Sequence, residues 1–387
     1  MDYGFGEQAE ELRRRLRALI AAETPPGYLG AFTNDPADLE VAQRFCRRLA
    51  EEGLLTVAWP TEYGGAGGSV WDQTVVREEM WAHHEPRGAQ YMGLNWVGPA
   101  IMAFGSDEQK QRLLPPIAAG EIIWCQGFSE PDAGSDLASL TTRAEPDGDG
   151  FRIYGQKIWT SYAQMAQCCV LAARVGPPTA RKHEGITILL VPMDRAGITV
   201  QPIRSMLGPH HLNEVFLDDV RVEPDEVLGG VGNGWAVIRR ALAHERVGIA
   251  RYARCERLLS RFEQEGVGGA QDAEPLSPSL RAQWARALVQ TRIARLLAYR
   301  AVAEQETGAP SDASASVARL AVTQCDQQVA ELLFQSVGPS SLEAGASAPL
   351  EGAAEDHWRY AQAATVASGT IEIQRMIVSR ALLGGRS

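Results

Sequence analysis

The chain has 387 residues, and its 48 acidic and 37 basic side chains give a formal net charge of −11 at pH 7. This length exceeds the usual size of one hydrophobic core and predicts two or three packed domains. The acidic balance argues against a nucleic acid or an anionic membrane as partner, because both select basic surfaces.

Helical periodicity dominates the first third of the chain. Leucines recur at helical spacing between Glu10 and Glu23, and Asp35-Pro36 opens a second amphipathic stretch. Ser106, followed three residues later by Gln109, predicts a capping box at the start of another helix.

The period changes at about Ile122, where short β-rich runs begin. They cover residues 151–153, 169–171, 186–191 and 215–217, and Gly, Pro and Asp separate them. Such runs predict a small β-barrel or sandwich.

Helical spacing returns after Gly234 and holds to the C-terminus. Breaks at residues 264–279, 308–314 and 337–352 separate about four long helices, as in a bundle. We therefore expect a multidomain α+β fold. It comprises an N-terminal helical domain (1–121), a middle β-barrel or sandwich domain (122–232) and a C-terminal four-helix bundle (233–387).

Cysteine and histidine patterns point to no disulfide framework and no metal. The six cysteines show no Cys-x-x-Cys pair, which favours a reducing compartment. No basic region precedes an apolar run at the start, and no apolar run could span a bilayer, so we expect a cytoplasmic protein without a membrane partner. The pairs His83-His84 and His210-His211 lack a third ligand at a recognisable spacing, so no metal site is predicted.

Two segments of the expected middle domain carry the most chemistry. Residues 127–136, GFSEPDAGSD, gather small and hydroxylated side chains in a turn whose amides can approach a polar ligand closely. Residues 155–161, GQKIWTS, set a flat indole beside two hydroxyls. Together they suit a planar, hydrogen-bonding ring system better than a phosphate alone.

Glu245 interrupts the apolar face of the helix expected from Trp235. Its stripe includes Ile238, Leu242, Ile249 and Tyr252. A carboxylate among such neighbours loses hydration, so we expect its pKa to rise toward neutrality, as a general base requires. The structural alternative is an ion pair with Arg239, Arg251 or an arginine of another helix.

These segments, in this order, resemble the acyl-CoA dehydrogenase family of flavoproteins. The resemblance runs nearly end to end and includes WPTEYGG from Trp59, FGSDEQK from Phe104, FLDDVRV from Phe216 and SGTIEIQR from Ser368. It implies FAD as the cofactor and an acyl-CoA thioester as the substrate, oxidised to a trans-2-enoyl-CoA.

The resemblance also implies the site residues. It assigns the flavin site to Phe128, Ser129, Gly134, Ser135, Trp159, Thr160, Ser161, Gln335 and Thr370, and substrate contacts to Ser135, Arg246, Ser368 and Gly369. Trp159 would lie against the isoalloxazine, and Thr160 or Ser161 would bond its edge. Taken singly, Gly134 is more often a turn glycine and Trp159 a core aromatic, and it is the joint spacing that favours a flavin.

The catalytic base occupies an unusual position. Many family members carry it as the Glu of a Tyr-Glu-Gly-Thr motif, which here reads Ala367-Ser368-Gly369-Thr370. An unactivated serine hydroxyl is too weak a base. A minority of members place the glutamate on the helix after the β domain, in the Glu-Arg context that Glu245-Arg246 matches. Glu245 is therefore the expected base, Ser368 would offer its N–H to the thioester carbonyl, and Glu372 belongs to a Glu-Ile-Gln-Arg signature.

Two other segments depart from the family pattern. An Arg-x-x-Phe-Gly segment usually completes the flavin site across a subunit interface, but residues 268–274 read GGAQDAE, whose acids would repel a diphosphate. Gln335 begins only half of a Gln-x-x-Gly-Gly motif. The same combination occurs in actinobacterial acyl-CoA dehydrogenases for steroid side chains, which pair two unlike subunits.

From that resemblance we expect a bulky or branched acyl group, an electron-transfer flavoprotein as acceptor, and either a homo-oligomer or a heteromer with a second acyl-CoA dehydrogenase-like subunit. Two other functions stay open. One is a flavin oxidase or monooxygenase on the same fold, which would use dioxygen. The other is a non-catalytic subunit of a heteromeric acyl-CoA dehydrogenase, against which the retained flavin segments and Glu245 count.

Overall fold

The computed structural model describes residues 5–30, 36–177, 179–208, 211–265, 277–308 and 311–384, without the side chains of residues 246, 247 and 265. Backbone contacts divide the chain into two units. The helical unit comprises Met1–Ala31, Ser69–Pro86 and Arg246–Ser387, and the sheet unit comprises Phe32–Gly68 and Arg87–Glu245. Neither unit is contiguous in sequence, and the expected division at residues 121 and 232 stays a prediction.

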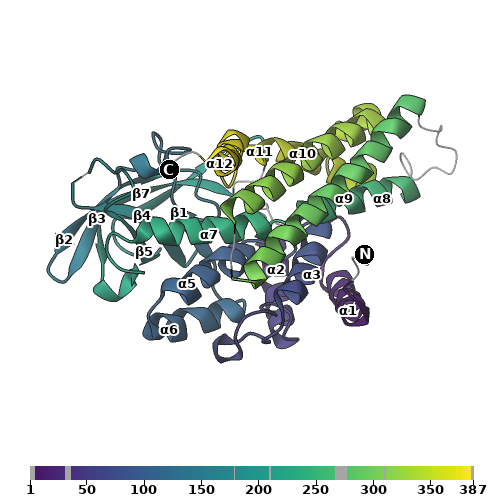
Figure 1. Cartoon of the computed structure of the whole chain (residues 1–387). Coiled ribbons are helices and arrows are strands. Elements are labelled where there is room, and N and C mark those ends of the chain that lie inside the picture. The colour runs from purple at the N-terminus through teal and green to yellow at the C-terminus, as the bar shows by residue number, and fades with distance from the viewer. Residues whose placement is uncertain are drawn as a thin grey trace. The chain divides into compact units, whose positions relative to one another are not determined.

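One sheet organises the sheet unit (Figure 1). Its strands are β1 (Trp124–Gly127), β2 (Arg143–Asp147), β3 (Gly150–Lys157), β4 (Cys168–Val175), β5 (Ile186–Pro192), β6 (Ile198–Ile203), β7 (Leu212–Val222) and β8 (Val227–Leu228). Within the described residues the order is β6-β7-β3-β2-β4-β5-β8, with β1 parallel to β4. All four β-rich runs expected from the sequence lie in these strands.

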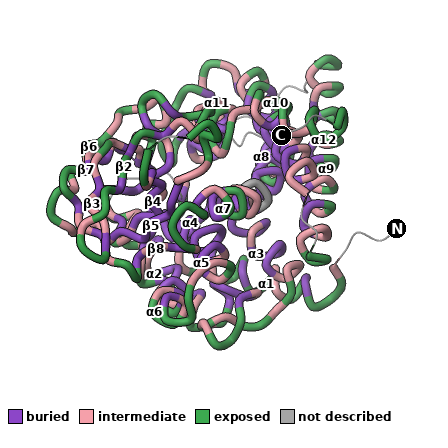
Figure 2. The backbone as a smooth tube through the Cα atoms, turned by 60° about the vertical axis from the view of Figure 1, so that its left-hand side comes forward, coloured by how far each residue is buried: buried purple, intermediate pink, exposed green. Residues whose placement is uncertain are grey.

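The middle of the sheet is the core of this unit. β4 and β5 pair antiparallel and are buried along most of their length (Figure 2), as expected for strands covered on both faces. The β3–β7 register shifts between Ile153 and Gly155. Gly155 has φ 152°, and a Cβ there would lie 2.5 Å from the Thr142 hydroxyl, so only glycine fits this close approach.

The helices of the sheet unit are α2 (Pro36–Glu51), α4 (Gln90–Met92), α5 (Gly98–Phe104), α6 (Asp107–Ala118) and most of α7 (Gly234–Gly248). The predicted capping box is confirmed: Gln109 N–H donates to the Ser106 hydroxyl at 3.1 Å, and Ser106 N–H donates to the Gln109 side chain at 3.0 Å. The Gln109 amide also donates to the Asp225 and Val227 carbonyls, which fixes α6 against β8.

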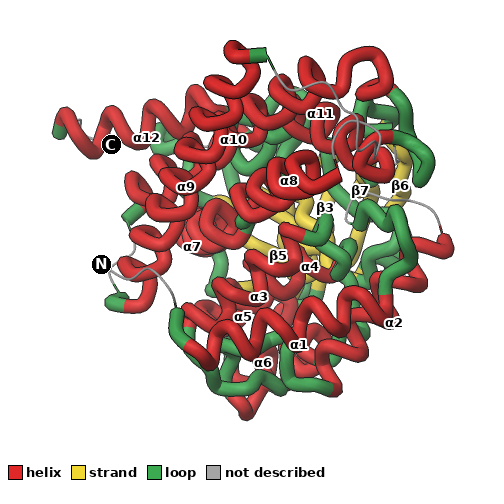
Figure 3. The backbone as a smooth tube through the Cα atoms, turned by 90° about the vertical axis from the view of Figure 1, so that its right-hand side faces the viewer, coloured by secondary structure: helices red, strands yellow, loops and turns green. Residues whose placement is uncertain are grey.

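The helical unit consists of α1 (Glu7–Glu23), α3 (Val70–Ala82), α8 (Arg251–Glu265), α9 (Pro278–Glu306), α10 (Asp312–Val337), α11 (Ala353–Ala363) and α12 (Ile371–Leu383). α10 packs against α8, α9, α11 and α12, and Figure 3 shows α9 and α10 side by side. The three expected breaks fall between α8 and α9, between α9 and α10, and between α10 and α11.

A buried acid joins α1 and α3 to the long helices. Glu78 of α3 is 2% exposed and accepts hydrogen bonds from Arg13 of α1, Tyr252 of α8 and Tyr299 of α9. A buried carboxylate persists only where donors replace its lost hydration. These long-range contacts make α1 and α3 part of the helical unit.

The expectation of one continuous helix from Trp235 through Tyr252 is wrong. α7 ends at Gly248, and α8 begins at Arg251. Glycine is a poor helix former, because ordering it costs more backbone entropy than ordering any other residue. Ile238 and Glu245 thus share α7, while Tyr252 belongs to the next helix.

The predicted fold class is confirmed, since helices precede and follow a middle β-sheet. None of the six cysteines forms a disulfide. Among the described residues, no helix has both the length and the apolar composition needed to cross a bilayer.

Candidate functional site

The first expected flavin segment leaves β1 and folds back on itself. Glu130 and Ala133 exchange backbone hydrogen bonds of 3.1 Å, which closes a tight turn. The expected contacts differ in exposure: Phe128 is buried, Ser129 half-buried, and Gly134 and Ser135 exposed. A Cβ on Gly134 would meet nothing within 4 Å, so the surface above this residue is open to a ligand.

The second segment presents an aromatic ring to solvent. Trp159 follows β3 in the left-handed region, with φ 60°, and its side chain is 55% exposed. Thr160 is fully buried, and its N–H donates to the Asn213 carbonyl of β7 at 3.0 Å. Ser161 is half-buried. A strained backbone that holds a large apolar ring in water is a pattern typical of functional sites.

Hydrogen bonds bring the two segments together within the sheet unit. The Ile158 N–H donates to the Ser129 carbonyl at 2.9 Å. An exposed indole, the open surface at Gly134 and the half-buried hydroxyls of Ser129 and Ser161 therefore belong to one hydrogen-bonded structure. This combination fits a flat ring with polar edges such as the isoalloxazine of FAD.

One ion pair links the two segments and was not identified from the sequence. Lys157, the last residue of β3, and Glu130 of the first segment lie 2.7 Å apart and are almost completely buried. They are 27 residues apart in the chain. The available signal was a lysine at the end of an expected strand, where a buried charge needs a partner.

Glu245, the expected base, lies in the last turn of α7 and is 9% exposed. Ala241 and Ile238, one and two turns earlier, are buried as well. α7 starts tightly against the sheet, because a Cβ on Gly234 would lie 2.7 Å from the Ile186 carbonyl oxygen. The carboxylate is therefore carried by a helix whose start is fixed against β5.

The two arginines considered as structural partners of Glu245 are placed differently. Arg251 forms a 2.7 Å ion pair with Asp326 inside the helical unit. Arg239 is exposed. Residues 268–274 and His210 lie outside the described residues, as does the side chain of Arg246.

A strained turn precedes α12 in the helical unit. Ser368 and Gly369 both have positive φ, at 58° and 86°. Gln374, fully buried, donates to the carbonyls of both residues, and buried Arg319 donates to the Ala367 carbonyl at 3.3 Å. Because C=O and N–H point in opposite directions across a trans peptide, the Ser368 N–H points away from Arg319.

The other expected residues of the helical unit differ in role. Thr370 caps α12, since its hydroxyl accepts from the Ile373 N–H at 3.2 Å. Gln335 is exposed, and its amide donates to Glu331 one turn earlier on α10. Glu372 is exposed in the first turn of α12 and has no apolar enclosure.

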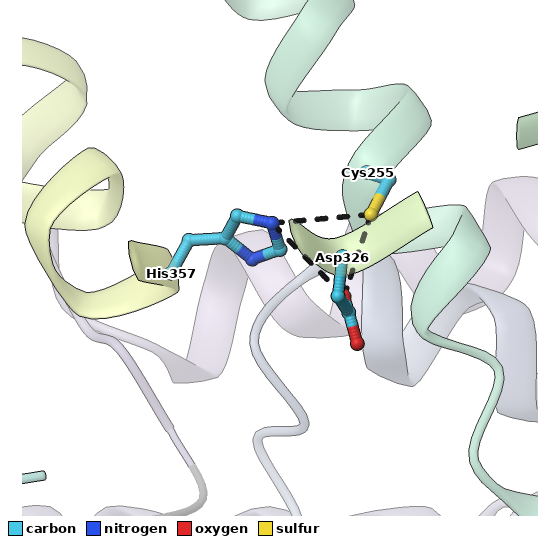
Figure 4. Close-up of side chains that lie close together, drawn as sticks. All are labelled: Cys255, Asp326 and His357. Atoms are coloured by element: carbon cyan, nitrogen blue, oxygen red, sulfur yellow. Dashed lines mark hydrogen bonds and ion pairs between the residues drawn. The ribbon is translucent and has the colours of Figure 1, made fainter. Parts of the chain in front are cut away.

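A buried cluster of metal-ligand types occupies the helical core (Figure 4). Cys255 Sγ lies 3.4 Å from Asp326 Oδ1 and 3.9 Å from His357 Nε2. Arg251 Nε donates to Asp326 Oδ2, and its Nη2 lies 3.4 Å from His357 Nδ1. A guanidinium can only donate, so Nδ1 accepts and Nε2 carries the hydrogen. A protonated Nε2 cannot bind a metal ion, and the neighbouring Arg251 guanidinium would repel one. The cluster is a polar link between α8, α10 and α11.

Sequence models of one family match nearly the whole chain. Sequence models of the acyl-CoA dehydrogenase N-terminal, middle and C-terminal domains match residues 6–121, 125–220 and 232–383. The chain is 34% identical over 398 residues to acyl-CoA dehydrogenase FadE26 of Mycobacterium tuberculosis, covering 99% of this chain and 98% of that protein. It is 30% identical over 350 residues to the mitochondrial short-chain specific acyl-CoA dehydrogenase of Homo sapiens, covering 87% and 82%.

Two solved structures resemble the chain over its whole length. The Tcur3481-Tcur3483 steroid ACAD superposes with a TM-score of 0.88 at 32% identity, covering 100% of both chains. The ChsE4-ChsE5 complex from Mycobacterium tuberculosis gives a TM-score of 0.86, also at 32% identity and 100% coverage of both chains.

Proposed function

The chain belongs to the acyl-CoA dehydrogenase family, and on that premise we propose that it oxidises an acyl-CoA thioester to the trans-2-enoyl-CoA with FAD as cofactor. The observation that carries the proposal is the burial of Glu245 on α7 in a chain whose usual base position holds Ser368. A buried carboxylate supplies the basicity that the serine lacks.

We assign the flavin contacts to the joined segments of the sheet unit. The exposed indole of Trp159 offers a face for the isoalloxazine, and Ser129 and Ser161 offer donors to its edge. Phe128, Gly134, Ser135 and Thr160 remain proposed contacts of this part of the site, although Thr160 is fully buried and both of its backbone groups bond Asn213. Gln335 and Thr370 remain proposed flavin contacts. FAD, when bound, accepts the hydride that leaves the β-carbon.

Glu245 is the proposed general base for the α-proton. Its burial limits contact with water, which favours the neutral acid after proton transfer. The Ser368 N–H, turned away from Arg319, is the proposed donor to the thioester carbonyl, where it stabilises negative charge as the α-proton leaves. Gly369 permits the strained turn that presents this N–H, and Ser135 and Arg246 remain proposed substrate contacts.

The substrate is proposed to be a bulky or branched acyl-CoA, with a steroid side chain as the leading class. The support is the similarity to a structure described as a steroid ACAD. The acids among residues 268–274 argue for a second, unlike acyl-CoA dehydrogenase subunit that would complete the flavin site, and one of the similar structures is the ChsE4-ChsE5 complex. We propose an electron-transfer flavoprotein as the acceptor and a cytoplasmic location.

Anaerobic flavin bleaching tests the role of Glu245. Glu245→Gln keeps the side chain's size but removes its basicity, so substrate-dependent flavin reduction should slow by about 10²–10⁴-fold while FAD stays bound. Glu372→Gln, an exposed carboxylate on α12, is the matched control and should reduce at the wild-type rate.

Unchanged flavin reduction in Glu245→Gln would remove the proposed base. The assay is run on the chain alone and on the chain coexpressed with a second acyl-CoA dehydrogenase-like subunit. Full FAD occupancy in the chain alone would remove the reason for that subunit. Fast oxygen consumption with peroxide release would favour the oxidase alternative.

A further inference from the structure

The segments assigned to the flavin rest on one buried ion pair of the sheet unit. The Lys157 ammonium, 0% exposed, donates to Glu130 at 2.7 Å and to the Phe128 carbonyl at 3.1 Å. Glu130 also accepts from the backbone N–H groups of Thr141 and Thr142, at 2.6 and 2.9 Å. Both charges thus have hydrogen-bonding partners in place of water.

The packing around the lysine leaves little freedom. A Cβ on Gly127 would lie 2.7 Å from Leu171 Cδ1 and 3.4 Å from the Lys157 side chain. Gly155 allows the approach of Thr142, whose N–H binds Glu130. Two glycines therefore shape the space that holds the pair, which makes it a built feature of the domain rather than a chance contact.

The pair fixes the orientation of a peptide group that faces the proposed site. The Phe128 carbonyl points toward the buried ammonium, so the N–H of the same trans peptide, that of Ser129, points away from the domain interior. The Ser129 N–H donates no hydrogen bond within the described part of the chain. The next carbonyl, that of Ser129, accepts from the Ile158 N–H. Hydrogen bonds to their carbonyls therefore hold two successive peptide groups in place.

We propose that Lys157 and Glu130 are positioning residues for flavin binding, which hold the Phe128–Ser129 peptide so that the Ser129 N–H faces the isoalloxazine. This inference rests on the proposed function, because it needs FAD in that place. Lys157 acts through the backbone and Glu130 through Lys157, so neither touches the cofactor or the substrate.

The charge state of the pair agrees with this role. Burial alone would raise the pKa of Glu130, but the Lys157 ammonium and the hydrogen bonds from Lys157, Thr142 and Thr141 lower it to about 2. Burial lowers the pKa of Lys157 despite the attraction of Glu130. The carboxylate is therefore ionised at neutral pH and keeps the ammonium aimed between itself and the Phe128 carbonyl.

A double variant separates positioning from stability. Lys157→Met removes the donor to Phe128 and leaves Glu130 as an unpaired buried charge. Lys157→Met with Glu130→Gln removes both charges, so the unfolding midpoint should return close to the wild-type value. The hydrogen bond to the Phe128 carbonyl is still missing in the double variant.

Two readouts follow the segment directly. In the cofactor-free chain, amide hydrogen exchange in a peptide covering residues 128–136 should be faster by about tenfold in the single and the double variant, the equivalent of one charge-assisted hydrogen bond. In the double variant, whose stability is restored, exchange in β4 and β5 should stay at the wild-type level. The dissociation constant for FAD, measured by flavin fluorescence, should rise by a similar factor, with the same partner subunit present in every sample if the wild type needs one.

Lys182→Met is the matched control. Lys182 pairs with Asp136 of the same segment at 2.7 Å, but both side chains are about 60% exposed, so exchange and FAD affinity should stay unchanged. A double variant with wild-type exchange and wild-type FAD affinity would overturn the positioning role. Absence of FAD binding in the wild-type protein would instead overturn the proposed function, so the two failures are distinguishable.

Discussion

Two buried ion pairs of equal length serve different purposes in the two units. Lys157–Glu130 in the sheet unit and Arg251–Asp326 in the helical unit both have a shortest N–O distance of 2.7 Å and are almost completely buried. The lysine also bonds a backbone carbonyl of an exposed segment. The arginine instead stacks on the Tyr360 ring, with its guanidinium carbon 3.7 Å from the centroid.

The two pairs also differ in how fully they are satisfied. Glu130 accepts hydrogen bonds from Lys157, Thr141 and Thr142. Arg251 Nη1 has no hydrogen-bond partner among the described residues. The same charge pairing can therefore support a binding surface or a helical core, depending on the third group that each cation touches.

The largest expected effect breaks the helical pair. Asp326→Asn leaves the Arg251 guanidinium buried without a counter-charge, so the free energy of unfolding should fall by about 3–5 kcal/mol in urea titrations. Arg251→Met combined with Asp326→Asn should recover most of that loss. Weakened FAD binding in either variant, measured where it is folded, would contradict the contrast between the two pairs.

The next expected difference between the two units is how their stability responds to acid. Burial and neighbouring arginines, Arg254 among them, hold the pKa of His84 and of His357 well below the usual value. Near pH 6.5 these histidines take up protons in the unfolded chain but stay neutral in the folded chain. Each one therefore lowers the free energy of unfolding by up to about 1.4 kcal/mol per pH unit below that value.

Glu130 titrates only at lower pH. Its stabilisation is present above pH 4.5, the ordinary value, and is lost as the pH falls toward its folded pKa of about 2. Between pH 6.5 and 5, hydrogen exchange should therefore accelerate in α8, α10 and α11 before it does in β3 and β4. His357→Gln should flatten this dependence, whereas His183→Gln, an exposed histidine of the sheet unit, should not.

A smaller effect separates site strain from stability. Trp159→Gly removes the left-handed strain of a bulky residue, worth about 1–2 kcal/mol, along with an indole that is 55% exposed. The free energy of unfolding of the cofactor-free protein should rise by about 1 kcal/mol or stay unchanged, while FAD affinity falls. Trp159→Phe keeps an aromatic face and should retain more affinity. Equal FAD binding by the glycine variant would remove the indole from the proposed site.

The smallest effect is expected at an exposed pair. Lys182→Met breaks its ion pair with Asp136, which water already screens, so the urea midpoint should shift by less than the equivalent of about 0.5 kcal/mol. A loss comparable to that of Asp326→Asn would mean that burial does not separate the two kinds of pair.

Local signals in the sequence predicted the elements well. The Ser106–Gln109 capping box, the four β-rich runs and the three helix breaks follow from interactions between residues close in the chain, and the structure bears out each of them. The continuous helix through Tyr252 was a wrong prediction. The apolar spacing continues past Gly248, but the helical backbone ends there and a new helix begins at Arg251.

Long-range groupings had no such signal. α1 and α3 belong to the unit of the C-terminal helices, where Glu78 meets Arg13, Tyr252 and Tyr299. The contact that links Glu130 to Lys157 joins positions 27 residues apart. Pairing over such distances depends on the packed fold rather than on local propensity.

The sequence by itself determined the order of helices and strands, the family resemblance and the residues proposed for the flavin and the base, because motifs and periodicity record local chemistry. Only the tertiary structure decided which of these side chains are exposed, that the Phe128 carbonyl points toward Lys157, and that Arg251 pairs with Asp326. Burial and the direction of a peptide group are properties of the assembled chain, since they depend on atoms that other segments bring into contact.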